Sequence, residues 1–310
     1  MGGPARKRAL VTGGAGFIGS HLVERLLREG LQVIVLDDLS VGLRENVPPG
    51  VQLVVGDVRD ANTVDRALAG VGVVFHLAAR VSIRASVDRF YEDAQTNVMG
   101  TLSLLQGCAA HKVRRFVYAS SMGVYADAPT PDPIPETHPT EPVSPYGVGK
   151  LAGEKYLLCL ASVLNVEPVI LRYFNTYGPR QSYTPYVGVI TIFIKRLLAG
   201  EPPVIFGDGK QSRDFVHVGD IADATLLAAQ KDVAGEVFNV GTGIATSVNR
   251  VAEMLSGKLN PAICPVHAPE HPGELRFSVP DISKARRLLG YDPRGRLEER
   301  IDEVIDWHRR

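Results

Sequence analysis

The stretch ALVTGGAGFIG, residues 9–19, decides the fold of this 310-residue chain. Its first four residues are apolar or β-branched and predict a short strand, whereas Phe17 and Ile18 begin an apolar pattern at helical spacing. Between them, Gly13, Gly16 and Gly19 recur at every third position. Because these glycines have no side chains, backbone amides at the amino end of the helix can approach a pyrophosphate. The stretch therefore predicts a strand, a phosphate-binding loop and a helix.

The pattern on either side of this stretch predicts a parallel sheet with helices on both faces. Short runs rich in β-branched residues alternate with helical patterns through the first half of the chain. We expect strands at residues 9–12, 32–37, 52–56, 73–77, 115–120 and 168–173, and helices at 18–29, 62–68, 93–111 and 146–164. The fold class is a doubly wound α/β sheet of the Rossmann type, with ligands beyond the carboxyl ends of its strands.

A carboxylate at the end of the second expected strand favours NAD as the cofactor. Asp37 is placed to accept hydrogen bonds from ribose hydroxyls, and it would repel the 2′-phosphate of NADP. Asp57 follows the third strand, where it either reaches the adenine edge or caps a helix. The fourth strand ends in uncharged apolar residues that let a flat cofactor lie close to the backbone, namely Leu77, Ala78 and Ala79.

A tyrosine and a lysine four residues apart predict the catalytic group. Tyr146 and Lys150 follow a helix start at Ser144 and Pro145, so their side chains share one helical face. A phenol titrates near 10, and the positive charges of Lys150 and of an oxidised nicotinamide are expected to lower the pKa of Tyr146 so that it can act as a base. Ser121, at the end of the fifth strand, is expected to hydrogen-bond the same substrate hydroxyl.

The second half of the chain predicts a smaller lobe. We expect residues 1–174 to form an NAD-binding domain and residues 175–310 a smaller, mixed α/β lobe that binds the substrate, because regular alternation ends there. Residues 213–240 again show a loop, a helix and a strand, so we expect them to pack back on the first domain. The proline-rich segment 126–144 predicts a loop just before Tyr146.

Composition excludes several classes of partner. The chain has 34 basic and 34 acidic residues without a basic block, so no nucleic-acid partner is expected. No apolar run reaches the roughly 20 residues of a membrane span, and the amino terminus does not resemble a signal peptide. Three widely separated cysteines predict free thiols and no metal site, which is typical of a cytoplasmic enzyme.

Taken together, these motifs carry a resemblance to a known family. TGGAGFIG, Ser121, YGVGK, RYFNTYGPRQ and GDGKQSRDFVHVGD resemble the extended short-chain dehydrogenase/reductases, and within them the UDP-galactose (UDP-glucose) 4-epimerases. The resemblance implies that tightly held NAD takes hydride from C4 of a sugar while Tyr146 takes the hydroxyl proton, and that the 4-keto sugar turns and is reduced on its other face. It also implies further cofactor contacts from Phe17, Ile18, Asp38, Val58, Asn97 and Tyr173, besides Tyr146 and Lys150.

The resemblance assigns substrate contacts to the smaller lobe. Asn175 is expected to hold the nucleotide, and Arg213 matches an arginine that grips the diphosphate with paired donors. His271 stands where an arginine is common in relatives, so Arg276 is expected to compensate. Ser278 matches a position where a bulky tyrosine excludes the 2-N-acetyl group, and a serine there predicts that UDP-N-acetylglucosamine is accepted, unless it simply faces solvent.

Several related functions stay open as alternatives. Sugar-nucleotide 4,6-dehydratases carry an Asp-Glu pair where this chain has Met122 and Gly123, neither of which is an acid or base. UDP-glucuronate 4-epimerases typically show Phe-Thr where this chain has Phe174 and Asn175. The sequence thus favours C4 epimerisation of UDP-galactose and UDP-glucose. The alternatives are an epimerase of UDP-N-acetylglucosamine or UDP-glucuronate, another sugar-nucleotide dehydratase or reductase, and a non-catalytic NAD-binding protein.

Two long helices predict a homodimer. The segments 93–111 and 146–164 carry more apolar residues than one sheet contact requires, including Leu102, Leu104, Leu105, Leu157 and Leu158. In members of the resembled family, two such helices from each subunit form the interface.

Overall fold

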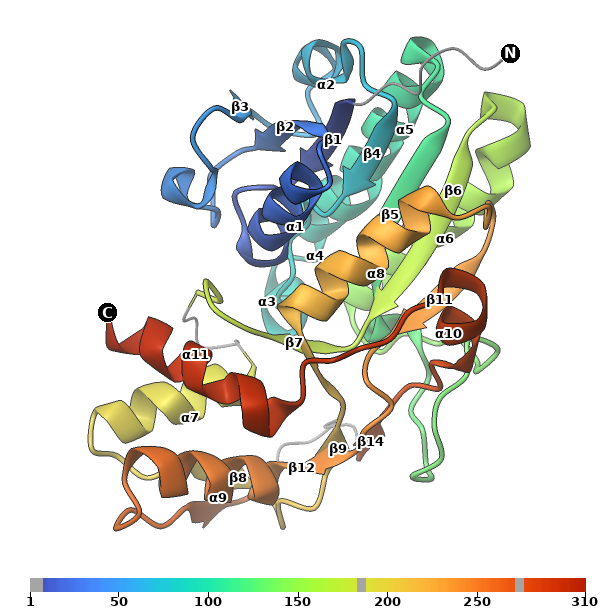
Figure 1. Ribbon diagram of the computed structural model, residues 1–310. Coiled ribbons are helices and arrows are strands. Elements are labelled where there is room, and N and C mark those ends of the chain that lie inside the picture. Colours follow the sequence, from blue (N-terminus) through green and yellow to red (C-terminus); the bar gives the residue numbers. More distant parts are fainter. Residues whose placement is uncertain (1–7, 183–187, 271–275) are drawn as a thin grey trace.

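A seven-stranded parallel sheet forms the centre of the protein (Figure 1). The computed structural model describes residues 8–182, 188–270 and 276–310. The strand order is β11-β6-β5-β4-β1-β2-β3, so the chain moves outward from β1 in both directions and confirms the doubly wound Rossmann class. The strands are β1 (Arg8–Thr12), β2 (Gln32–Asp37), β3 (Gln52–Val55), β4 (Val73–His76), β5 (Arg115–Ser121), β6 (Glu167–Tyr173) and β11 (Val237–Val240).

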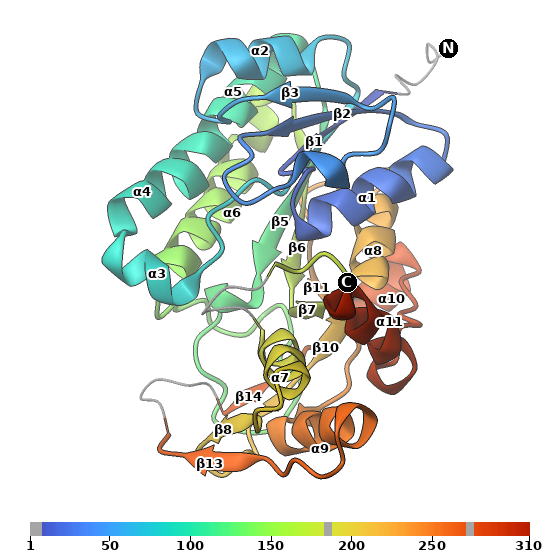
Figure 2. The same ribbon diagram turned by 90° about the vertical axis from the view of Figure 1, so that its left-hand side faces the viewer.

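Side chains alternate between two core clusters along each strand. In β1, Leu10 faces a core that includes α2 (Ala61–Leu68), α5 (Gly100–His111) and α6 (Pro145–Leu164). Its neighbours Ala9 and Val11 face a core built with α1 (Phe17–Arg28), α8 (Val218–Gln230) and α10 (Ser283–Leu289). Figure 2 shows α1 and α8 on one side of the sheet and α5 and α6 on the other. Both faces are buried, which explains the continuous apolar runs of the strands.

A third core cluster lies below the sheet in Figure 1. It joins α7 (Val189–Leu198), α9 (Val248–Leu259) and α11 (Leu297–Arg309). Short strands pair around it: β7 (Asn175–Tyr177) with β10 (Phe215–His217), β8 (Val204–Phe206) with β13 (Val266–Ala268), and β9 (Ser212–Arg213) between β12 (Thr246–Ser247) and β14 (Phe277–Ser278). Since α8 and β11 belong to the large sheet layer, the chain enters this region after β6, leaves it through β10, and enters it again after β11. The boundary at residue 174 stays a prediction.

The expected helix at 93–111 is not one helix. It consists of α4 (Phe90–Ala94), a π-helical turn η2 (Gln95–Met99) and α5. Within η2, the side chain of Asn97 accepts a hydrogen bond from the Arg80 amide at 2.9 Å and donates one to the Arg80 carbonyl at 3.0 Å. The wider turn thus accompanies a side chain that is bonded to the loop after β4. The sequence patterns also missed α3 (Ile83–Asp88), whose first turn is capped by Ser82.

The apolar surplus expected on the two long helices is largely buried in their own subunit. Leu104, Leu105 and Leu157 are at most 1% exposed, and Leu158 packs against the same core. Exposed apolar side chains of these segments are found elsewhere, namely Phe90 and Tyr91 of α4, Met99 of η2, Val143 just before α6, and Val148, Tyr156 and Val163 of α6. Among the described residues, none of the helices combines the length and apolar character needed to span a bilayer.

Candidate active site

The glycine loop between β1 and α1 is packed so tightly that side chains are excluded. Gly13 has a φ of 70°, and a Cβ on it would lie 2.8 Å from the Ala78 nitrogen. A Cβ on Gly19 would lie 2.0 Å from the Gly13 carbonyl oxygen. The loop therefore presses against both the end of β4 and the first turn of α1, as the sequence pattern predicts.

The amino end of α1 fits a pyrophosphate. The helix begins after Gly16, which has no side chain to cap it, and its first turn, starting at Phe17 and Ile18, carries no acidic residue. Within the described residues no side chain caps this helix, so its first amide groups and the positive end of its dipole can receive an anion. This open helix end and the glycine cradle beside it are the features that a dinucleotide requires.

Asp37 lies at the end of β2 and supports the glycine loop. Its side chain is buried, and its two oxygens accept hydrogen bonds from the amides of Ala15 and Leu39, each at 2.9 Å. Burial raises the pKa of this carboxyl group above its usual range. Asp38 beside it accepts hydrogen bonds from Ser40. A contact of either aspartate with the ribose stays a prediction.

Asp57 is not a helix cap, contrary to one of its two expected roles. Asp60 caps α2 by accepting a hydrogen bond from the Asn62 amide at 3.1 Å. The carboxylate of Asp57 instead accepts hydrogen bonds from Arg59, whose Nε lies 3.0 and 2.9 Å from its two oxygens. This guanidinium lowers the pKa of Asp57. Val58 is buried beside the start of α5.

The other predicted cofactor positions line the same carboxyl edge of the sheet. Leu77, Ala78 and Ala79 follow β4, and the Ala78 amide donates a hydrogen bond to Thr12 Oγ1 at 3.2 Å. Tyr173 ends β6, and its buried hydroxyl shares a 2.7 Å hydrogen bond with Thr225 Oγ1 of α8. Burial raises the pKa of Tyr173.

The structure brings together the three predicted catalytic residues. Helix α6 begins where Ser144 Oγ accepts a hydrogen bond from the Gly147 amide at 3.1 Å, and Tyr146 stands in its first turn. Ser121, at the end of β5, is hydrogen-bonded to the Tyr146 phenol. Lys150 Nζ donates a hydrogen bond to the Ala119 carbonyl at 2.8 Å. The end of β5 and the first turns of α6 thus lie next to each other.

The electrostatics of Tyr146 differ from the expectation. Burial raises the pKa of Tyr146 to about 12, although the hydrogen bond with Ser121 acts in the opposite direction. Burial also lowers the pKa of Lys150 to about 8, against the carboxylates of Asp93 and Glu154, which raise it. Without bound NAD, burial therefore outweighs the predicted lowering of the Tyr146 pKa, because the low-dielectric surroundings penalise the phenolate.

Two of the predicted substrate residues, Arg213 and Ser278, lie in the small sheet of β12, β9 and β14, whereas Asn175 lies in β7. Arg213 on β9 is the register partner of Ser278 on β14, and Ser278 is 0% exposed, so the solvent-facing alternative is wrong. The amide nitrogen of Asn175 and the hydroxyl of Ser278 have no hydrogen-bond partner within the described part of the chain. Arg276 is bound at 2.8 Å to both oxygens of Asp208. His271 lies outside the described residues.

Two charged residues beside the catalytic residues were not predicted from the sequence. Glu154 of α6 and Arg172 of β6 form a buried ion pair behind Lys150. The four-residue spacing of Tyr146, Lys150 and Glu154 could have indicated Glu154. No sequence pattern near Arg172 indicates that it pairs with Glu154.

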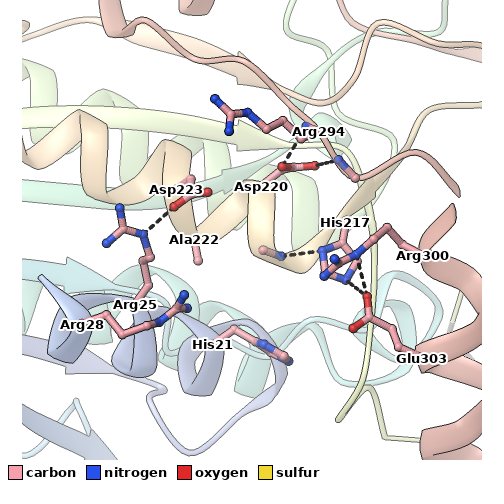
Figure 3. A pocket seen from close by; sticks show the side chains of 12 residues that line it. His21, Arg25, Arg28, His217, Asp220, Ala222, Asp223, Arg294, Arg300 and Glu303 are labelled. Atoms are coloured by element: carbon pink, nitrogen blue, oxygen red, sulfur yellow. Dashed lines mark hydrogen bonds and ion pairs between the residues drawn. The ribbon is translucent and has the colours of Figure 1, made fainter.

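A charged pocket of about 320 Å³ lies away from these residues, between α1, α8 and α11 (Figure 3). Its cations are partly neutralised within it, since Arg25 pairs with Asp223 and Arg300 with Glu303. None of the predicted site residues lines it.

A Rossmann sheet with a glycine loop, an acidic residue ending β2 and a Ser-Tyr-Lys set defines a nucleotide-dependent enzyme of the short-chain dehydrogenase type. Comparison with known proteins agrees, because residues 9–241 match the model of the NAD dependent epimerase/dehydratase family. The chain belongs to this family, and its cofactor is NAD.

Solved structures of relatives match nearly the whole chain. A UDP-glucose 4-epimerase of Thermotoga maritima with UDP-glucose is 40% identical, with a TM-score of 0.93 over 97% of this chain and 98% of that one. A UDP-glucose 4-epimerase of Thermus thermophilus in complex with NAD is 39% identical, with a TM-score of 0.90 over 97% and 99%. A UDP-N-acetylglucosamine 4-epimerase of Methanobrevibacter ruminantium is 36% identical, with a TM-score of 0.92 over 97% of each chain.

Proposed function

We propose that the protein is an NAD-dependent UDP-sugar 4-epimerase, and that its sugars are the UDP-hexoses UDP-galactose and UDP-glucose. The observation that carries the proposal is the meeting of Ser121, Tyr146 and Lys150 at the carboxyl edge of the sheet, beside the glycine loop. The similarity to UDP-glucose 4-epimerases over nearly the full chain supports the choice of substrate class.

The residues divide the proton chemistry among them. Bound NAD would supply a reversible hydride acceptor for C4 of the sugar. Tyr146, as phenolate, takes the proton of the C4 hydroxyl and gives it back to the same oxygen after the 4-keto sugar has turned. Ser121 hydrogen-bonds the phenol and steadies the shared proton. Since hydride and proton both return to the sugar, no net oxidation occurs.

The ionisation of Tyr146 requires positive charge near the phenol. With its own side chains alone, the pKa of Tyr146 is about 12, so the phenolate is scarce at neutral pH. The Lys150 ammonium favours the phenolate by Coulomb attraction in a site of low dielectric, and an oxidised nicotinamide bound beside it would add positive charge. Proton transfer is thereby tied to the oxidised form of the cofactor.

The residues after Ser121 argue against dehydration. Met122 and Gly123 form a short 3-10 turn there, and the Gly123 Cα faces the ring of Tyr146. Neither residue can protonate a leaving hydroxyl, so elimination of water from the sugar has no acid at this position. Epimerisation needs only the hydride and the proton that Tyr146 handles.

The sugar preference follows from Ser278. The side chain of Ser278, next to Arg213 in the sheet register, is much smaller than a tyrosine, which supports UDP-N-acetylglucosamine as a second substrate of the proposed enzyme. The variant Ser278→Tyr should lose turnover of UDP-N-acetylglucosamine and keep that of UDP-glucose. Equal effects on both sugars, measured as kcat/KM, would sink the steric argument.

The assembly is proposed to be a homodimer through α4 and α6. An apolar groove lined by Phe90, Val98, Val143 and Val148 lies on this face, and Phe90 and Val143 are 63% and 74% exposed. Such apolar area is costly to leave in water. Sedimentation at micromolar concentration should give the mass of a dimer, and a monomer would refute it. A cytoplasmic location stays a prediction of the sequence.

The direct test follows the C4 configuration of the sugar. Purified protein is incubated with UDP-galactose without added reductant, and proton NMR should show conversion to UDP-glucose without net NADH. Tyr146→Phe is the matched control, because it keeps NAD but lacks the phenol, and we expect turnover to fall by about 10²–10⁴-fold. A parent protein that binds NAD and leaves UDP-galactose, UDP-N-acetylglucosamine and UDP-glucuronate unchanged would contradict the proposal and favour the non-catalytic alternative.

A further inference from the structure

A buried ion pair lies directly behind the catalytic face of α6. Arg172 Nε donates to Glu154 Oε1 at 2.9 Å and Arg172 Nη2 donates to Oε2 at 2.7 Å, so the contact is bidentate. The side chains of Arg172 and Glu154 are 5% and 1% exposed. Removing two charges from water is costly, and only close and complete pairing offsets this cost. The pair is therefore a rigid unit that joins β6 to α6.

Two neighbouring contacts fasten the end of β5 to the same helix. Glu154 lies four residues after Lys150, so both side chains share one face of α6. Lys150 donates its hydrogen bond to the carbonyl of Ala119, and Ser120 Oγ donates one to Glu154. These two strand residues immediately precede Ser121. The placement of Ser121 against the helix thus depends on Lys150 and Glu154 together.

Arg172 extends the unit to the loop that precedes Tyr146. Its Nη1 donates to the Glu136 carbonyl at 3.2 Å, and its guanidinium carbon lies 4.7 Å from the centre of the Tyr125 ring. Glu136 belongs to the proline-rich segment and also accepts a hydrogen bond from the Asn239 amide of β11 at 2.9 Å. One buried guanidinium therefore contacts α6, this loop and the residue after η3 (Met122–Val124).

We propose that Glu154 and Arg172 are positioning residues, which fix the end of β5 against α6 and so hold Ser121, Tyr146 and Lys150 in the arrangement that moves the proton. The inference rests on the proposed function, because it assigns a task to residues that do not touch the substrate. An ion pair that only stabilised the fold would change the melting temperature but would leave kcat of the folded protein and its pH dependence unchanged.

The charge of Glu154 gives a readout specific to this role. Lys150 is surrounded by titratable groups from four elements, and Asp93 and Glu154 raise its pKa against burial. Without the Glu154 charge, the pKa of Lys150 falls below about 8, so its ammonium is lost at lower pH. The alkaline limb of the kcat profile should then move to lower pH. The groups that face Lys150 are Asp93 of α4, His76 of β4, Tyr118 of β5, and Tyr146 and Glu154 of α6.

Two variants separate positioning from stability. Glu154→Gln keeps the size of the side chain and removes its charge. The double variant Glu154→Met with Arg172→Met removes both charges and leaves none unpaired, which is compatible with a folded protein. The matched control is Glu167→Gln, since Glu167 pairs with Arg114 and Arg115 at the opposite end of β6.

For Glu154→Gln and for the double variant we expect kcat to fall by about 10- to 100-fold, because small displacements of reacting groups slow the reaction strongly. KM should stay within about twofold of the parent value. Glu154→Gln should also shift the alkaline limb of the kcat profile to lower pH. Glu167→Gln should keep kcat within about twofold of the parent, because a partly exposed ion pair contributes little to stability. A folded charge variant that turns over at the parent rate, or an alkaline limb that stays in place in Glu154→Gln, would overturn the proposal.

A crystallographic comparison keeps this inference separate from the proposed function. If the parent epimerises no UDP sugar, the proposed function fails, but the structure of the double variant still tests the positioning. Separation of Lys150 Nζ from the Ala119 carbonyl, 2.8 Å in the parent, supports it. An unchanged contact, together with an unchanged hydrogen bond between Ser121 and Tyr146, overturns it.

Discussion

Two groups of charges in this protein use the same chemistry in different surroundings. Behind α6, Arg172 and Glu154 are almost completely removed from water and are joined by two hydrogen bonds. In the pocket of Figure 3, Arg25 and Asp223 are joined by one, and their side chains are 26% and 53% exposed. The difference shows that burial, and not the presence of an ion pair, decides how much of the structure depends on it.

The largest effect is expected from breaking the buried pair on one side. In Arg172→Met the carboxylate of Glu154 stays buried without its cation, so the free energy of unfolding should fall by about 3–5 kcal/mol. Urea denaturation at pH 7 measures this loss. A change below about 1 kcal/mol would mean that the buried pair resembles a surface pair, and the comparison would break down.

A smaller effect is expected from the buried histidine of the charged pocket. His217 Nδ1 accepts a hydrogen bond from the Gly219 amide at 3.1 Å, and Nε2 lies 3.0 Å from Glu303 Oε1. Burial, with the charge of Arg300, outweighs this carboxylate and lowers the pKa of His217 to about 4. The folded protein therefore keeps this ring neutral where the unfolded chain, with a pKa near 6.5, takes up a proton. Its contribution to stability is present above pH 6.5 and is lost as the pH falls towards 4, by at most about 3 kcal/mol.

The variant His217→Asn isolates this contribution, because asparagine can still cap α8 without titrating. Its free energy of unfolding should fall less steeply between pH 6.5 and 4 than that of the parent, as followed by denaturation at several pH values. Parallel curves for the two proteins would assign the acid sensitivity to other groups.

The smallest effect is expected from the exposed pair of the pocket. Arg25→Gln removes the contact with Asp223 and should cost only about 0.2–1 kcal/mol in the free energy of unfolding. Added salt should shrink the difference further, since ions screen exposed charges. If Arg25→Gln lowered the free energy of unfolding as much as Arg172→Met, the solvent exposure of an ion pair would not predict its contribution to stability.

The large sheet could be predicted from the sequence, whereas the small sheets could not. Strands buried on both faces leave continuous apolar runs, so β2 was placed at its observed bounds. The strands β9, β12 and β14 are two residues long and pair with partners far along the chain, and no local pattern marks such pairing. The π-helical turn at η2 was missed because its apolar spacing differs little from that of a helix.

For the site, spacing identified the residues but not their surroundings. Gly13, Ser121, Tyr146 and Lys150 stand where motif and strand order put them. The sign of the Tyr146 pKa shift was missed, because it depends on how completely the folded chain removes the phenol from water. The partner of Glu154 was missed for a similar reason, since Arg172 reaches it only through the pairing of β5 with β6.

The position of β11 in the sheet has a consequence for synthesis. All residues of the predicted catalytic and cofactor sets have left the ribosome once residue 173 has emerged, yet β6 keeps an unpaired edge until residues 237–240 follow. The sheet face that α8 and α10 cover stays incomplete for longer, until residues 283–289 of α10 have also emerged. Open strand edges and apolar faces attract other chains, so the nascent protein passes through an interval in which its site is encoded but its scaffold is incomplete.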